Sequence, residues 1–317
     1  MLKTDAESNT PEERDHRMQI HPTPGGAEDS RGPEDSRPED GGPEDQGGHG
    51  VVLAVASQKG GVGKTTTALN LGFALAQRGW RILIVDTDPQ GAVGLSLRRN
   101  DQEGQGLIDC LESGARLEDV ILHTRLAELD VLTFGGSQGD RPWRLRDELY
   151  DPDALEHFFD HVANGYDIVL VDTPGGAYGP TLSILRQCDA VLFPLQAEPL
   201  ALRSVTQILD AVGLLREEGV NLEVAGFLLT MLSPEDDVSV LVAQESWQLL
   251  PKELILNANV PRDGAFLRAT AHGVPVGLLS KRPPQVAAVF DLVAHEIEGR
   301  LGLLSTEGAD EPISLFD

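Results

Sequence analysis

The chain has 317 residues and a formal net charge of −26, from 25 Lys and Arg residues against 51 Asp and Glu residues. Apolar residues make up 40% of it, which can fill the core of one large α/β domain or two small ones and excludes a chain that is disordered throughout. The acidic balance excludes a protein that coats nucleic acid over a broad surface, so any DNA contact has to come from a small local patch of bases.

The sequence also lacks the marks of a membrane or secreted protein. No run of eighteen apolar residues is present, which predicts no transmembrane helix. Met1–Arg14 has no apolar stretch of the kind that a secretory signal carries. The two cysteines, Cys110 and Cys188, have no CxxC spacing and are too few to stabilise a fold of this length through disulfides. Together these features predict a protein of a reducing cytoplasm.

The first 50 residues differ from the rest in composition. They contain 13 acids and 5 bases, with scattered Pro and Gly and a degenerate Pro-Glu-Asp repeat. A segment with so little apolar surface cannot offset the entropy lost on ordering, so residues 1–50 are predicted to be a disordered acidic tail. This tail is either an inert solubilising segment or a partner-binding arm. The acidic residues 304–317 are predicted to be flexible, which leaves 51–303 as the folded domain.

Short apolar runs alternate with helical segments in this domain. Two helices are predicted, each closed by a glycine: Thr65–Arg78 before Gly79, and Leu200–Glu218 before Gly219. Near-continuous apolar runs predict strands that are covered on both faces: Val51–Ala56, Arg81–Val85, Asp167–Val171, Ala190–Leu195 and Val224–Thr230. Strands alternating with helices predict an α/β fold with a doubly wound, mostly parallel sheet and helices on both faces.

The first predicted strand runs into a glycine-rich segment, KGGVGKTT at Lys59–Thr66, and then into a helix. Glycines let successive N–H groups turn toward one anion, and the helix N-terminus adds partial positive charge. The pattern predicts a nucleotide phosphate loop in which Lys64 reaches the β- and γ-phosphates and the Thr65 hydroxyl binds Mg²⁺. The plain GxxxxGK[ST] spacing fails because Gln58 replaces the first glycine, and a second lysine, Lys59, precedes the glycine pair.

Acidic residues follow two of the predicted strands. Asp86 and Asp88 are predicted to lie just past the end of one strand, and Asp172 at the same edge of another. A single Asp after a strand is usually a turn former or a cap. Three of them beside a phosphate loop, at the edge where open α/β sheets collect ligands, instead predict carboxylates that hold a Mg²⁺–nucleotide.

These motifs resemble the ParA/MinD family of deviant-Walker ATPases, which are P-loop NTPases. Lys59–Thr66 resembles the deviant Walker A motif of the family, VDTDPQG at Val85–Gly91 its second motif, and VLVDTPG at Val169–Gly175 its Walker B motif. The resemblance continues through Phe193–Val205 and Val260–Val276, so it extends over the whole predicted domain. One departure is a DTPGG sequence after the Walker B strand, where many relatives read DTPP.

The resemblance implies a slow, partner-stimulated ATPase in which two subunits sandwich two ATP molecules with Mg²⁺. Lys59 would reach the phosphates of the partner subunit, Asp88 would position the attacking water, and Asp86 and Asp172 would orient metal-bound water. The implied catalytic residues are Lys59, Lys64 and Asp88, and the implied metal site is Thr65, Asp86 and Asp172. The implied ATP-binding residues are Lys59, Gly60, Gly61, Val62, Gly63, Lys64, Thr65 and Thr66, with Pro261, Arg262 and Asp263 lining the adenine.

The resemblance further implies a homodimeric switch that binds nonspecific DNA with ATP and positions a cargo until a partner stimulates hydrolysis. The cargo would be a chromosome or plasmid locus, a protein cluster or, as in PomZ-like members, a division site. The candidate DNA contacts are Arg268, Lys281 and Arg282, with Arg203 and Arg300 as weaker ones; each is alternatively an ordinary solvated base. The resemblance implies a partner with a basic segment, ParB-like or a cluster scaffold, and the acidic chain suits such a segment by charge complementarity. The ATP form is expected on the nucleoid.

Two other classes remain as alternatives. A MinD-like membrane switch needs a C-terminal amphipathic helix with lysines on one face, which the terminal ISLFD does not provide. A metabolic relative would carry paired cysteines for a cluster, whereas Cys188 in QCDAV reads as a small buried thiol. ATP-dependent carboxylate ligases share the phosphate loop but typically lack the lysine at position 59. Residues 1–50 also lack the apolar periodicity of an operator-binding helix-turn-helix.

Overall fold

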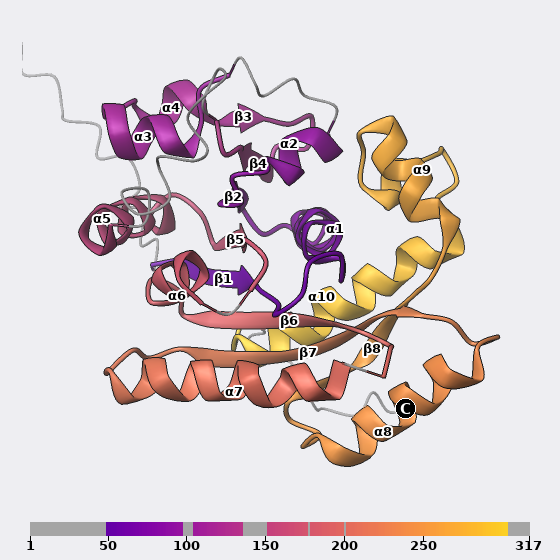
Figure 1. Cartoon of the computed structure of the whole chain (residues 1–317). Helices are drawn as coiled ribbons and strands as arrows, with labels where there is room; N and C mark the ends of the chain where they lie inside the picture. Colours follow the sequence, from indigo (N-terminus) through magenta and orange to yellow (C-terminus); the bar gives the residue numbers. More distant parts are fainter. Residues whose placement is uncertain (1–48, 98–103, 136–150, 177, 200, 304–317) are drawn as a thin grey trace, which may run out of the picture. The chain divides into compact units, whose positions relative to one another are not determined.

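The computed structural model describes residues 49–97, 104–135, 151–176, 178–199 and 201–303, all of which belong to one compact unit (Figure 1). Residues 1–48 of the predicted tail 1–50, and the predicted tail 304–317, lie outside the described residues, while Gly50 already donates its N–H to the Ala163 carbonyl at 2.8 Å. In the described part of the chain, no helix is long and apolar enough to cross a membrane.

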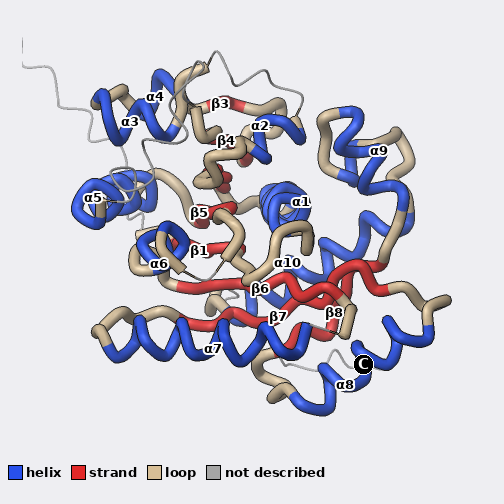
Figure 2. The backbone as a smooth tube through the Cα atoms, in the orientation of Figure 1, coloured by secondary structure: helices blue, strands red, loops and turns tan. Residues whose placement is uncertain are grey.

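An eight-stranded sheet forms the centre of this unit, in the order β3-β4-β2-β5-β1-β6-β7-β8 (Figure 2). All neighbouring strands are parallel except the short edge strand β3, which runs antiparallel to β4. The predicted α/β class and the mostly parallel sheet are therefore confirmed. The strands are β1 Val51–Val55, β2 Ile82–Asp86, β3 Leu122–His123, β4 Leu129–Leu132, β5 Ile168–Asp172, β6 Ala190–Gln196, β7 Glu223–Leu232 and β8 Ile255–Pro261.

The central strands are apolar because helices cover them on both faces. One core gathers side chains of α5, α6, α7 and α8 with one set of strand residues, and the second core gathers those of α1, α9 and α10 with the alternate set. The helices are α1 Lys64–Gln77, α2 Ala92–Ser96, α3 Leu107–Ser113, α4 Leu117–Val120, α5 Pro152–Ala163, α6 Pro180–Leu185, α7 Ala201–Glu217, α8 Asp237–Leu249, α9 Gly264–His272 and α10 Ala288–Arg300, with two 3-10 turns, η2 Val276–Leu278 and η3 Gln285–Ala287.

Two strand ends differ from the sequence prediction. Asp86 and Asp172 are the last residues of β2 and β5, where they face each other in register, rather than residues just past the strands. The ladder continues through them because their backbone groups pair with neighbouring segments: Thr87 donates its N–H to the Asp172 carbonyl at 3.0 Å. Both carboxylates are thereby fixed at the carboxyl edge of the sheet.

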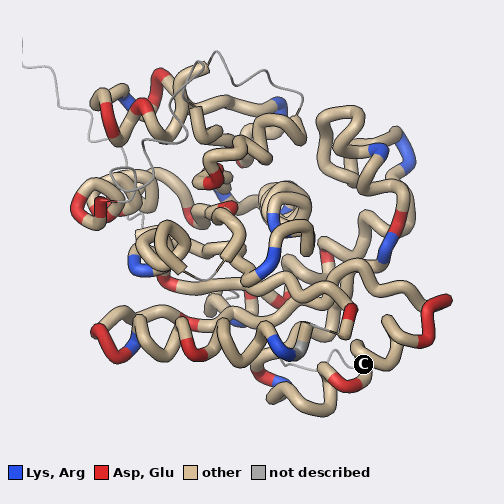
Figure 3. Tube along the Cα trace, viewed as in Figure 1, with Lys and Arg blue, Asp and Glu red and all other residues tan. Residues whose placement is uncertain are grey.

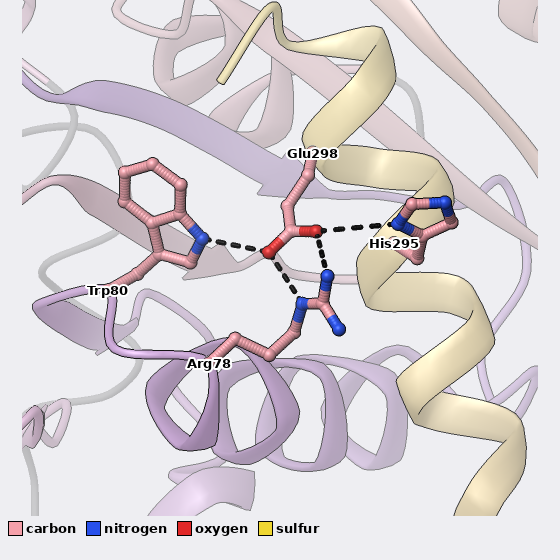
Figure 4. A network of polar contacts seen from close by, with 4 residues as sticks. All are labelled: Arg78, Trp80, His295 and Glu298. Carbon is pink, nitrogen blue, oxygen red and sulfur yellow. Dashed lines mark hydrogen bonds and ion pairs between the residues drawn. The ribbon is translucent and has the colours of Figure 1, made fainter. Parts of the chain in front are cut away.

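An ion pair between a buried carboxylate and Arg78, whose side chain is 35% exposed, joins the end of α1 to α10 (Figure 4). The Glu298 carboxylate, 3% exposed, accepts hydrogen bonds from Arg78 Nε and Nη2, each at 2.6 Å, and from Trp80 Nε1 at 2.8 Å. His295 Nδ1 lies 3.8 Å from the second carboxylate oxygen. The helix that follows the phosphate loop is thus held at its far end by charge-assisted hydrogen bonds.

Candidate functional site

The glycine-rich segment forms a tight loop between β1 and α1. Gly61 and Gly63 have φ values of +77° and +96°, a region that L side chains rarely adopt, so glycine is required at both positions. No side chain caps the N-terminus of α1 at Gly63, and the first-turn N–H groups therefore remain as donors for an anion. The loop is anchored from β7, where Thr230 Oγ1 donates to the Val62 carbonyl at 2.9 Å.

The two lysines of the loop lie in different environments. Lys64 is 8% exposed and lies close to Asp172, whose pKa its charge lowers. Lys59 is at the rim, where the side chain is 34% exposed and Nζ pairs with Glu198 Oε1 at 2.9 Å. One lysine is therefore buried within its own site, while the other is at the surface and held by an acid at the end of β6.

The segment after β5 closes over the phosphate loop. A Cβ atom at Gly175 would lie 3.7 Å from Gly60 N and 3.9 Å from Lys64 Nζ, so this backbone contacts the loop directly. Gly176 has a φ of +108° and donates its N–H to the Ser57 carbonyl at 3.0 Å. Gly175, which departs from the DTPP pattern, would keep ordinary van der Waals distances with a side chain, whereas the positive φ of Gly176 requires glycine at the turn that follows.

Two acidic residues at the carboxyl edge of the sheet, Asp86 and Asp172, are buried side by side. Asp172 Oδ2 accepts from Thr65 Oγ1 at 2.6 Å, while Oδ1 is buried with no hydrogen-bond partner among the described residues. Burial raises the pKa of Asp172 to about 7, and burial together with the charge of Asp172 raises that of Asp86 well above its usual value. An unpaired buried carboxylate oxygen beside a threonine hydroxyl fits a Mg²⁺ ligand set.

Asp88 lies in the turn between β2 and α2, partly exposed at the same edge. Its N–H donates to Asp86 Oδ1 at 3.0 Å, and its own Oδ1 accepts from Gln90 N at 2.9 Å. Asp86 Oδ2 accepts in addition from Val93 N at 2.9 Å. The turn is therefore held by hydrogen bonds that leave one Asp88 oxygen for another partner.

A cavity of about 340 Å³ opens beside the phosphate loop. It includes Pro261, Arg262 and Asp263, which the sequence predicts to line the adenine. The Asp263 carboxylate is also the N-cap of α9, where it accepts a hydrogen bond from Ala265 N at 2.7 Å, so it stabilises the start of this helix. Sequence reasoning missed the other walls, which come from the end of β7 and from the helices: Thr230, Met231, Phe266, Leu267, Thr270 and Phe290.

The candidate DNA contacts divide into two groups. Arg268 on α9 and Lys281 and Arg282 between η2 and η3 are exposed, and α9 contacts η2. Residues 264–290 contain no Asp or Glu, in a chain with 51 of them; Figure 3 shows the Lys and Arg segments beside α9. Arg300, a weaker candidate, is wrong: it donates to the carbonyls of Ala225, Glu253 and Ile255 and so clamps the ends of β7 and β8.

Comparison with known proteins identifies the family. A family model described as an AAA domain matches residues 50–225. The sporulation initiation inhibitor protein Soj of Bacillus subtilis is 32% identical over 246 residues, covering 77% of this chain and 96% of the relative. The chain belongs to the ParA/MinD family of P-loop ATPases. It is also 37% identical over 239 residues to the chromosome partitioning protein ParA of Caulobacter vibrioides, covering 71% of this chain and 85% of that one.

A solved family member shows that the fold binds a nucleotide. The septum site-determining protein MinD of Pyrococcus horikoshii, complexed with Mg-ADP, superposes with a TM-score of 0.66 at 25% identity, covering 80% of this chain and 98% of that one. The predicted family, fold and ATPase class are therefore confirmed for this chain, whereas a PomZ-like place within the family stays a prediction. The roles of individual residues stay predictions.

Proposed function

We propose that this ParA-family ATPase is an ATP-dependent dimerisation switch that binds nonspecific DNA and positions or segregates a cargo. Its relatives Soj and ParA, the latter named for chromosome partitioning, support this choice of branch. The observation that carries the proposal is the separation of the two lysines. Lys64 is buried in the site of its own subunit. The Lys59 side chain is 34% exposed at the rim, where it is accessible to the nucleotide of a second subunit.

In this switch the residues of the loop hold ATP and those of the sheet edge hold Mg²⁺. The N–H groups of Gly60–Thr66 and the Lys64 ammonium bind the phosphates, and the cavity at Pro261–Asp263 takes the base. Thr65, Asp86 and Asp172 hold Mg²⁺, which neutralises phosphate charge. Asp88 orients the attacking water, and Lys59 of each subunit reaches the nucleotide of the other. Hydrolysis is consequently slow until the dimer and a partner complete the site.

DNA binding is assigned to the acid-free segment at 264–290. Arg268, Lys281 and Arg282 are its exposed arginines and lysine, and a two-fold dimer doubles the patch. The acidic remainder of the surface repels phosphate, so contact is confined to this patch and weakens steeply with salt. A partner with a basic segment is attracted to the acidic remainder, mainly through its association rate.

The test uses Asp88→Ala, which is expected to bind ATP and dimerise without hydrolysing it. We expect this ATP-locked dimer to retain duplex DNA of arbitrary sequence at low salt, and a fluorescent fusion to coat the nucleoid. Joint charge reversal of Arg268, Lys281 and Arg282 should abolish retention, while reversal of Arg116, an exposed arginine on another element, should not. Normal turnover by Asp88→Ala, or fluorescence at the membrane rim or throughout the cytosol, would contradict the proposal.

A further inference from the structure

The buried side chain of Asn70 joins two segments that are far apart in the sequence. Asn70 lies on α1 and is 6% exposed. Its Nδ2 donates to the Thr66 carbonyl at 2.8 Å, in the first turn of α1. Its Oδ1 accepts from the backbone N–H of Val276 at 2.7 Å, at the start of η2. The buried Asn70 amide is therefore hydrogen-bonded to a backbone carbonyl of α1 and to a backbone N–H of η2.

A second contact fixes the same segment on α1. A Cβ atom at Gly277 would lie 2.7 Å from Phe73 Cε1, closer than real Cβ contacts allow, so the η2 backbone rests directly on the aromatic ring of α1. Only glycine fits this approach without moving Phe73, which is itself 7% exposed. The start of the segment is thus held on α1 by a hydrogen bond and by packing.

Both ends of this connection lead to proposed binding surfaces. Thr66 belongs to the phosphate loop and lines the cavity beside it. Val276 begins the stretch that continues through the exposed Lys281 and Arg282 to η3. The contacts therefore run from the nucleotide cavity through Thr66 and Asn70 to the segment that carries the positive charge.

We propose that Asn70 is a positioning residue that couples the phosphate loop to the basic segment at 276–287. The proposal rests on the proposed DNA-binding function and names how that function is linked to ATP. A phosphate bound at the N-terminus of α1 orders its first turn, and Asn70 passes this order to Val276, which sets the position of Lys281 and Arg282. Because binding free energies are reciprocal, DNA also raises the affinity for ATP by the factor that ATP raises the affinity for DNA.

Three variants in the Asp88→Ala background separate this coupling from simple packing. Asn70→Ala removes both hydrogen bonds. Val276→Pro removes the N–H donor and replaces the buried valine side chain, while the Asn70–Thr66 hydrogen bond stays. Proline suits the first position of a helical turn, and Pro275, with a ψ of 152°, is compatible with a following proline. Val276→Ala is the matched control, because it trims the same side chain and keeps the N–H.

We expect Asn70→Ala and Val276→Pro to bind ATP with wild-type affinity and to dimerise. Their ATP dimers should bind duplex DNA about five- to tenfold more weakly, the loss typical of one buried hydrogen bond. DNA should no longer raise their ATP affinity, a readout that a merely structural role would not move. Val276→Ala should behave like its parent. Wild-type DNA affinity in Val276→Pro, or an equal loss in Val276→Ala, would overturn the role of Asn70.

Amide hydrogen exchange tests the coupling between ATP and residues 276–287 without DNA. If the parent ATP dimer binds no DNA, the proposed function fails, but ATP should still slow amide exchange across 276–287 in the parent protein. The same protection should be absent from Asn70→Ala, while α5, on the opposite face of the sheet, exchanges equally in both. Identical ATP-induced protection in parent and variant would refute the coupling itself.

Discussion

Arg78→Ala tests how the phosphate helix is held at its far end. In the native protein the Glu298 carboxylate is 3% exposed and receives two hydrogen bonds from Arg78 and one from Trp80 (Figure 4). The substitution leaves a buried carboxylate with the indole N–H as its remaining strong donor. The Arg78 side chain is 35% exposed, so the cost is below the ~3–5 kcal/mol typical of a fully buried pair, and we expect about 2–3 kcal/mol in the free energy of unfolding. For a domain of this size that corresponds to a fall in Tm of about 4–12 °C.

The stability that Arg78→Ala loses should become smaller as the pH is lowered. Burial raises the pKa of Glu298, but the hydrogen bonds from Arg78 and Trp80 and the charge of Arg78 outweigh burial and hold that pKa below its usual value. A lowered folded-state pKa gives stabilisation that is present above the unfolded pKa, about 4.3, and is lost as the pH falls through the folded value. In the variant burial dominates and the carboxyl protonates more readily. The difference between the two proteins should therefore shrink as the pH is lowered.

Urea denaturation followed by circular dichroism measures both effects, at neutral pH and at about pH 4, close to the unfolded pKa of the carboxyl. Arg116→Ala is the matched control, because Arg116 pairs with Glu118 in the open, with side chains 74% and 67% exposed, and such a pair contributes about 1 kcal/mol or less. Arg78→Leu combined with Glu298→Leu should recover much of the stability, since no charge is left buried. An Arg78→Ala loss no larger than that of Arg116→Ala, or one that grows on acidification, would refute the reasoning.

Three further predictions concern the nucleotide site. Lys64→Ala should lose ATP binding in a fluorescent-nucleotide titration, and unchanged affinity would count against the phosphate-loop assignment. Glu198→Gln removes the charge that holds Lys59, so the ATP needed for half-maximal dimerisation in sedimentation experiments should fall, by up to about fivefold for a half-exposed pair; a rise would show that Glu198 helps Lys59 to act. Asp172→Asn removes a carboxyl whose pKa burial raises to about 7. Since a raised carboxyl pKa costs folded-state stability as the pH rises toward that value, the variant should melt higher than wild type without nucleotide at neutral pH, and magnesium-nucleotide should no longer stabilise it; a lower Tm would contradict this.

Local patterns in the sequence were enough to predict the centre of the fold. The five strands β1, β2, β5, β6 and β7 have continuous apolar runs and the phosphate loop has a fixed glycine spacing, and both signals act within a few residues. The strand ends at Asp86 and Asp172 were misplaced by one residue, because a charged side chain resembles a turn signal unless the opposing strand is known. Strands β3 and β4 were missed because they are short, and the edge strand β8 was missed because Asn257 and Asn259 interrupt its apolar run.

The contacts that reach across the chain were beyond sequence reasoning. Glu198 lies 139 positions from Lys59, and Val276 lies 206 positions from Asn70. Nothing in either local pattern indicates the partner, although an acid at the end of a predicted strand was a signal that could have singled out Glu198. Arg300 shows the opposite error: its charge suggested a surface contact, whereas the fold uses its guanidinium to bind three carbonyls.

The acid-free stretch at 264–290 has a consequence for how this protein can change over evolutionary time. Arg268, Lys281 and Arg282 project from α9 and from the loop before η3, and none of them contributes to either core of the sheet. Substitutions at these positions can raise or lower the local charge at almost no expense to folding. The attraction of this segment to polyanions can therefore change while the fold and the residues of the nucleotide site stay the same, so homologues that share one nucleotide site can differ widely in their affinity for polyanions.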